Sequence, residues 1–175
     1  IDMGAVEYEQ ASWGLSQNDA DYAAVIVDCS RQFGLADEHI NAARNTGNYY
    51  RFLVGDLPEV TLIDDSHQFI TKAGCWQVRF DAGHSRRHMS LSDSGRELHI
   101  CVDFLLPRIS PNISAKLRDL NADMLADYLN YLDGMTHCPA DWLIIPGHDW
   151  PYYGGGARAR QLCDHHAARL DQLLH

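Results

Sequence analysis

The pattern of hydrophobic and polar positions changes near the end of the first third of the chain. From Asn18 to Phe33, cap-type Asn and Asp residues precede apolar residues at helical spacing, which predicts a helix that ends near Gly34. A second helix is predicted from Asp37 into the cluster Tyr49–Leu53. Gly47 interrupts this second segment, so two shorter helices are the alternative.

From Val60 onward, short alternating or apolar runs between turn residues predict strands, with antiparallel hairpins at the turns 72–74 and 93–95. The predicted strands are Val60 to Ile63, Gln68 to Thr71, Cys75 to Phe80, His88 to Ser92 and Leu98 to Val102. An irregular loop with two prolines follows. The last predicted elements are a helix from Asp119 to Leu132, a buried strand from Trp142 to Ile145, a glycine hinge at 154–156 and a helix from Ala157 to Leu174.

Composition narrows the class of protein. A chain of 175 residues with 46% apolar content is long enough for one domain with a core. The net charge of −10 disfavours nucleic acid as a partner, because such binding depends on Lys and Arg. No apolar run is long enough to cross a bilayer, and the five scattered cysteines contain no CxxC pair. We therefore expect a soluble, cytoplasmic protein with no membrane partner.

Three side chains that are able to bind metals each follow a predicted buried strand. They are His84, Asp103 and His148. Imidazole nitrogen and carboxylate oxygen together suit zinc or a similar divalent ion, and only a folded sheet could bring residues so far apart in sequence together. A local turn cap is the alternative role for Asp103, because a carboxylate at a buried strand end needs a partner.

The segments around these residues resemble motifs of the metallo-β-lactamase superfamily. Gly83–His88 resembles its GH[ST]xxH signature, Cys101–Asp103 with the apolar residues that follow resembles its Asp-bearing strand end, and Pro146–His148 resembles its PGH loop. The resemblance extends over about Val60 to Pro151 and lies closest to the broad hydrolase and thioesterase-like branch. It implies an α/β fold, the αββα sandwich, of which this chain resembles the second, carboxy-terminal sheet with its flanking helices.

The chain departs from this family at its beginning. The HxHxDH motif of the family, which supplies ligands to both metals, is absent; Asp2 stands where the tail of that motif is expected. We therefore expect residues 1–175 to form a single metallo-β-lactamase-like domain without the amino-terminal sheet. The final helix resembles one that leads, in one branch, into a winged helix, and the chain would lack that extension.

The resemblance implies metal-assisted hydrolysis. It assigns His84 to one divalent ion, His148 to another and Asp103 to both, with zinc expected and iron or manganese as alternatives. It makes Asp2 the candidate catalytic residue, and it makes His88 a residue that supports a ligand or donates a hydrogen bond to the substrate. Because neither ion would have a full ligand set, we expect the isolated 175 residues to bind zinc weakly or not at all, unless another segment or chain completes the site.

The substrate implied by the family is a small acyl compound, namely an ester, thioester or lactone. A second hypothesis is a degenerate, non-catalytic member of the fold that binds a ligand or another subunit. A third is an RNA-processing member, which the acidic net charge disfavours. Whether the chain forms a homo-oligomer stays open.

Overall fold

The computed structural model describes residues 1–114 and 118–174, which divide into two compact units. Unit 1 contains Ile1–Leu62 and residues 118–122, and unit 2 contains Ile63–Ser114 and residues 123–174. All the strand ends that bear the candidate metal ligands belong to unit 2. Within the described ranges, no helix has both the length and the apolar composition that a membrane span needs.

Unit 1 is mainly helical. Its helices are α1 (Ala5–Ser16), α2 (Asp19–Gln32), α3 (Asp37–Thr46) and α4 (Tyr50–Leu53), and the short strands β1 (Asp2–Gly4) and β2 (Thr61–Ile63) pair with each other. Asn18 caps α2, because its side-chain oxygen accepts a hydrogen bond from the Asp21 amide at 2.9 Å. Gly47 has a φ of 64° and ends α3, so the alternative of two shorter helices is confirmed.

The sequence analysis missed β1 and α1. Apolar residues in Ala5–Ser16 are not gathered on one face of the helix, and only Ala11 and Gly14 are buried, so the helical period is weak. The segment is held by Asn48, whose buried amide group donates hydrogen bonds to the carbonyls of Gly14 and Gln17 at 2.8 Å each. This tertiary contact has no local sequence signal.

Unit 2 is built on a five-stranded sheet in the order β3-β4-β5-β6-β7. The strands are β3 (Gln68–Thr71), β4 (Gly74–Asp81), β5 (His88–Asp93), β6 (Leu98–Val102) and β7 (Leu143–Pro146), close to the predicted bounds. The first four strands pair antiparallel through the two predicted hairpins, and β7 pairs parallel to β6. The strands β4, β6 and β7 therefore run in the same direction.

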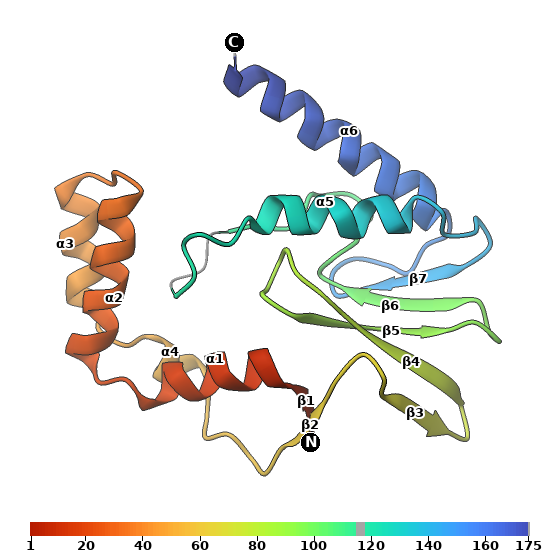
Figure 1. Ribbon diagram of the computed structural model, residues 1–175, viewed down its shortest axis with the longest axis horizontal. Coiled ribbons are helices and arrows are strands. Elements are labelled where there is room, and N and C mark those ends of the chain that lie inside the picture. Colours follow the sequence, from red (N-terminus) through yellow and green to blue (C-terminus); the bar gives the residue numbers. More distant parts are fainter. Residues whose placement is uncertain (115–117, 175) are drawn as a thin grey trace. The chain divides into compact units, whose positions relative to one another are not determined.

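Two helices, α5 (Met124–Met135) and α6 (Gly155–Leu174), lie on one side of this sheet (Figure 1). Tyr128, Tyr131 and Leu132 of α5 are fully buried in the core that also contains Cys101 of β6 and Leu162 of α6. Helix α5 begins later than predicted, because the Asp123 side chain accepts a hydrogen bond from the Ala126 amide and caps the helix there.

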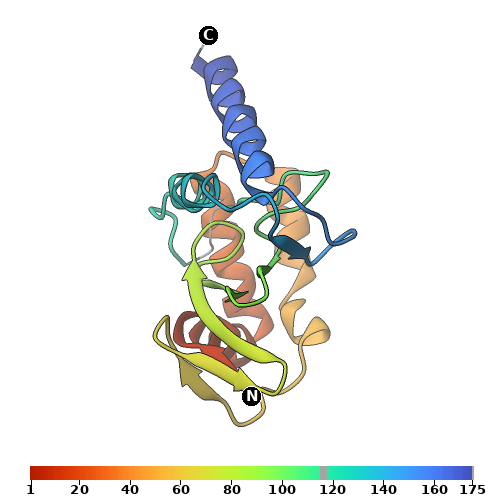
Figure 2. The same ribbon diagram turned by 90° about the vertical axis from the view of Figure 1, so that its right-hand side faces the viewer.

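The glycines at 154–156 do not form the predicted hinge. Gly155 and Gly156 are buried in the first turn of α6, and a side chain at Gly155 would lie 2.7 Å from the Ile144 side chain. At Gly156 it would lie 2.7 Å from the backbone carbonyl oxygen of Cys138. These glycines allow α6 to start directly against β7, and Figure 2 shows the helix running away from the strand.

The other face of the sheet is also apolar. Val78 is paired with Leu91, and Phe80 with Met89, in the β4–β5 register; Ile100 lies opposite Leu91 on β6. Val78 and Phe80 form a second hydrophobic cluster with Ile63. The sheet of unit 2 therefore has apolar residues on both faces, as a central layer of a sandwich does.

Candidate metal centre

The topology of unit 2 places three strand ends at one edge of the sheet. His84 lies in the loop after β4, Asp103 directly follows β6, and His148 lies two residues beyond β7. Because these three strands run in the same direction, their carboxyl ends meet at the same edge. The structure thus brings together the three residues that the sequence analysis predicts as metal ligands.

Asp103 lies between the two histidines. The Nε2 atom of His84 is 3.5 Å from Oδ2 of Asp103, and Nε2 of His148 is 3.4 Å from Oδ1. Each imidazole thus faces a different oxygen of one carboxylate. The Oδ1 atom is buried and has no hydrogen-bond partner among the described residues. Such an oxygen needs a cation or a donor, since burial of an unpaired carboxylate oxygen costs free energy.

The tautomer of His84 follows from its second ring nitrogen. Nδ1 lies 3.0 Å from the carbonyl oxygen of Asn112, and a carbonyl oxygen can only accept, so Nδ1 carries the proton. In the neutral imidazole, Nε2 then presents its lone pair toward the Asp103 carboxylate. Two acceptors at this separation require a cation between them, either a proton on the ring or a metal ion.

The distances suit a metal ion. Two donors that each lie about 2.1 Å from a tetrahedral zinc ion are about 3.4 Å apart. The two pairs, His84 with Asp103 and His148 with Asp103, have this separation. Among the described residues, however, no group of three His, Cys, Asp or Glu side chains is placed to hold one ion. The donor set therefore fits two ions with two ligands each, fewer than the three protein ligands of a catalytic zinc site.

The backbone at these strand ends is distorted. The β6–β7 register shifts between Ile100 and Val102, and Val102 has a φ of 45°, a region that β-branched residues rarely adopt. The Gly147 amide donates a hydrogen bond to the Val102 carbonyl at 2.7 Å. A side chain at Gly147 would lie 2.6 Å from Oδ1 of Asp103. The glycine of the PGH loop therefore leaves room for the carboxylate.

His88 belongs to unit 2, and Asp2 belongs to unit 1. The His88 ring, at the start of β5, lies against the His84 ring with a centroid distance of 5.9 Å and against Phe104 at 4.8 Å. This position beside a candidate ligand agrees with the predicted role of His88 as a residue that supports a ligand, and that role stays a prediction. Asp2 is an exposed residue of β1 in unit 1, and its catalytic role also stays a prediction.

Cys101 is close in sequence to Asp103 but is not a candidate ligand. The residue is fully buried, and burial raises the pKa of its thiol to about 12. Metals bind the thiolate, so a thiol that stays protonated at neutral pH is a poor ligand. Its sulfur instead donates to the Leu105 carbonyl at 3.4 Å and packs in the core under α5 and α6.

The sequence analysis missed the groups that hold the loop after Asp103. Arg158 of α6 donates hydrogen bonds to the carbonyls of Leu106 and Ile109 at 2.8 and 2.9 Å. Tyr128 and Tyr152 donate to the carbonyls of Phe104 and Leu105. Backbone carbonyls accept all four bonds, and the Asn112 carbonyl also supports His84. No side-chain pattern in the sequence identifies such acceptors.

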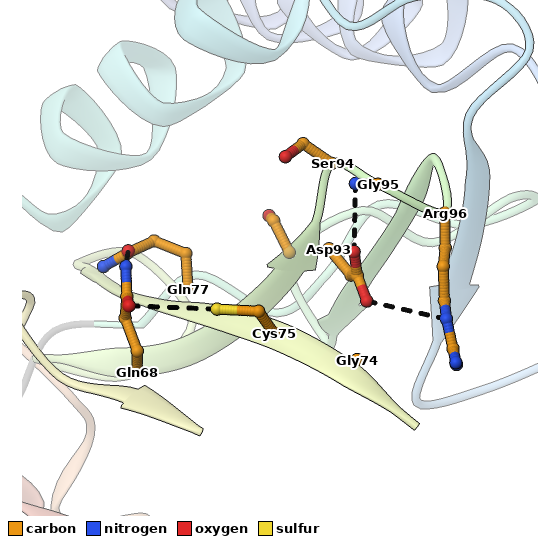
Figure 3. Close-up of a pocket in the computed structure, with 9 residues that line it drawn as sticks. Gln68, Gly74, Cys75, Gln77, Asp93, Ser94, Gly95 and Arg96 are labelled. Atoms are coloured by element: carbon orange, nitrogen blue, oxygen red, sulfur yellow. Dashed lines mark hydrogen bonds and ion pairs between the residues drawn. The ribbon is translucent and has the colours of Figure 1, made fainter. Parts of the chain in front are cut away.

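A polar cavity of 480 Å³ lies at the opposite ends of β4 and β5 and takes no part in this centre (Figure 3). Its charged groups contact each other: Arg96 lies 3.8 Å from Asp93, whose other oxygen accepts a hydrogen bond from the Gly95 amide. Cys75 contacts the Gln68 side chain at 3.8 Å. The cavity is separated from the candidate metal ligands by the length of the strands.

No protein-family model and no curated protein matches this chain. Solved structures do match it. A beta-lactamase domain protein from Burkholderia ambifaria is 34% identical, with a TM-score of 0.67, over 70% of this chain and 38% of that protein. A metallo-beta-lactamase family protein from Thermus thermophilus is 23% identical, with a TM-score of 0.68, over 84% of this chain and 46% of that protein. The chain thus spans less than half the length of these two proteins.

A further match is a protein solved in a di-iron-bound form, TTHA1623. It is 18% identical, with a TM-score of 0.53, over 91% of this chain and 62% of that protein. This likeness concerns the path of the backbone. At this identity it shows the fold alone.

Proposed function

We propose that this chain, which has the metallo-β-lactamase fold, carries one half of a dinuclear metal site of a hydrolase. The observation that carries the proposal is the position of the Asp103 carboxylate, with one imidazole nitrogen facing each of its oxygens. His84 would bind one ion, His148 the other, and Asp103 both. A carboxylate between two cations is the arrangement of two-metal hydrolytic sites.

Divalent ions supply Lewis acidity at such a site, which lowers the pKa of water and polarises a carbonyl or phosphoryl oxygen. Other residues of this chain orient the candidate ligands and leave space for them. The Asn112 carbonyl holds the proton of His84 on Nδ1 and so keeps Nε2 available as a ligand. Gly147 leaves space for Asp103, whose buried Oδ1 atom has no hydrogen-bond partner among the described residues.

The remaining ligands would come from an HxHxDH motif on another sheet. Support for this comes from the apolar second face of the sheet of unit 2, where Val78 and Phe80 are buried in a cluster with Ile63. Phe69, Met89 and Leu91, which pack against this cluster, are only partly buried, and a further layer would bury them more completely. In this proposal Asp2 belongs to the end of that motif and acts as the catalytic residue that orients water and passes a proton to the leaving group. The substrate would be a small ester, thioester or lactone, in keeping with the motif Gly83–His88.

A second candidate function has its own observation. No three His, Cys, Asp or Glu side chains of the described residues are placed to hold one ion. This favours a non-catalytic binding module in which the metal site is degenerate. The two functions differ in metal content, because only the hydrolase requires a complete dinuclear site.

The test is made on the full-length protein. After incubation with zinc, iron or manganese and dialysis, elemental analysis should find about two ions per chain, as a two-metal site requires. The same protein should hydrolyse a generic acyl thioester, and His84→Ala should abolish both the second ion and the activity. Two ions with activity retained in His84→Ala and in Asp103→Asn would refute the assignment. Absence of bound metal would support the binding module.

A further inference from the structure

A small cavity of 260 Å³ lies beside His148 at the same edge of the sheet. It is lined by Leu106, Pro107, Arg108, Ile109, His148 and Asp149. We propose that this cavity, here called the acyl pocket, binds the apolar acyl group of the substrate. The link between the pocket and the reaction rests on the proposed function; the binding itself does not.

One wall of the acyl pocket is the loop from Leu106 to Ile109, which Arg158 holds from behind. Its Nε atom donates to the Leu106 carbonyl and its Nη2 atom to the Ile109 carbonyl. Both ends of the wall are thus fixed by one guanidinium group from α6. Hydrogen bonds from a charged donor are stronger than neutral ones, so this wall is formed before any ligand arrives.

The second wall is the turn that contains His148 and Asp149. Asp149 has a φ of 73°, and one of its oxygens accepts a hydrogen bond from the Trp150 amide at 2.9 Å. Its other oxygen lies 2.9 Å from Nε of Arg108, which belongs to the first wall. This ion pair therefore connects the two walls.

The chemistry of the lining selects an uncharged, apolar ligand. Arg108 and Asp149 neutralise each other, so the pair offers no net charge to an anion or a cation. Leu106 is buried, while the Ile109 side chain is 60% exposed and would lose water contact if a chain of methylene groups covered it. The volume is below the range of about 300–1,000 Å³ typical of whole-ligand pockets, so it accommodates part of a substrate.

The position of the pocket fits an acyl group. His148 lines it and also faces Asp103, so a ligand with its apolar chain in the pocket would have its carbonyl end next to the candidate metal ligands. Substrates with a longer acyl chain would then bind more tightly than acetyl compounds. A site for a charged leaving group would instead show an unpaired basic side chain.

The test uses hexanamide, an uncharged acyl compound without an ester bond, and acetamide as its short-chain counterpart. Methyl and amide NMR spectra of the metal-free chain are recorded during titration. Hexanamide should shift the Ile109 methyl signal and the amides of 106–109 and 148–149 in a saturable way. Each methylene contributes a few-fold in affinity, so hexanamide should bind at least about ten-fold more tightly than acetamide.

Two matched variants locate the binding. Ile109→Asn should weaken hexanamide binding by at least about ten-fold, because it places an amide on the apolar wall. Ile70→Asn is the control, since Ile70 is 81% exposed on β3 and does not line the pocket. Both side chains are exposed, so both variants should fold, which their thermal unfolding checks. Shifts at other residues, a lack of saturation, or equal effects of the two variants would overturn the proposal.

The outcome is separate from that of the hydrolase assignment, because the titration needs neither metal nor turnover. If hexanamide fills the pocket while the full-length protein hydrolyses no acyl compound, the pocket is upheld and the hydrolase is refuted. If the full-length protein hydrolyses thioesters while hexanamide does not bind, only the acyl pocket is refuted.

Discussion

The Nε2 atom of His84 faces the Oδ2 atom of Asp103 at 3.5 Å. Because the other ring nitrogen of His84 is committed to the Asn112 carbonyl, the neutral ring presents a lone pair to a carboxylate. This arrangement is favourable only with a cation between the two groups. His148 repeats the contact on the second carboxylate oxygen at 3.4 Å, so one aspartate serves two imidazoles.

Asp103→Asn tests this relationship with little change in shape. The amide keeps one oxygen but loses the charge, so we expect zinc affinity to fall by about 100-fold or more, beyond the effect of losing a supporting residue. Isothermal titration of the full-length protein with zinc measures the change. Asp141→Asn is the control, because Asp141 is an exposed residue before β7 and outside the site. Equal zinc affinity in both variants would contradict the role of Asp103.

Gly147→Ala should disturb the site through sterics alone. Its new methyl group would lie 2.6 Å from Oδ1 of Asp103 and 3.1 Å from the Val102 side chain, so the carboxylate must move. We expect a loss of about 1–3 kcal/mol in the free energy of unfolding, together with weaker zinc binding. Urea unfolding and zinc titration measure the two effects. Gly55→Ala is the control, since an added methyl group there has no described atom within 4 Å apart from those of the adjacent residues, and its stability should be unchanged or higher.

Arg158→Lys tests the support of the loop after Asp103. Lysine keeps the charge but has no fork with which to reach two carbonyls, so one of the bonds to Leu106 and Ile109 is lost. We expect unfolding to become easier by about 1–2 kcal/mol. Arg169→Lys, on the exposed part of α6, should change it much less. A similar loss in both variants would show that Arg158 acts only through helix propensity.

His99 makes the free energy of unfolding depend on pH. It is buried between Ser92 and Tyr131, and burial, with a smaller effect of Arg79, lowers the pKa of its imidazole to about 4. Between about pH 6.5 and pH 4 the unfolded chain binds a proton that the folded chain does not, so the free energy of unfolding falls as the pH falls. The fall attributable to His99 is about 3 kcal/mol.

Urea unfolding at pH 7 and pH 4.5 measures this dependence in the wild type and in His99→Asn. The variant removes the titrating ring and keeps a group that can bond to Ser92. It should lose less stability than the wild type over the same pH interval. An identical loss in both proteins would assign the pH dependence to other groups.

The sequence was sufficient for the fold class and most strands, because strands and turns leave local signals. It also placed the three candidate ligands at strand ends that the structure brings together, and their role as ligands stays a prediction. The sequence was insufficient where contacts between residues far apart in the chain determine the local structure. Helix α1 lacks an amphipathic pattern and depends on Asn48, and the close packing of Gly155 on β7 looks in sequence like a flexible glycine run. The support of His84 by the Asn112 carbonyl is a backbone contact without any sequence signature.

The central claim is that His84 and His148 bind metal through Nε2 with Asp103 between them. It is tested most directly by ¹⁵N NMR of the histidine rings during titration of the chain with excess zinc. We expect the Nε2 signals of His84 and His148 to shift together while Nδ1 of His84 keeps its proton, and we expect neither shift in Asp103→Asn. Zinc-dependent shifts confined to other histidines, such as His165 and His166, would contradict the claim.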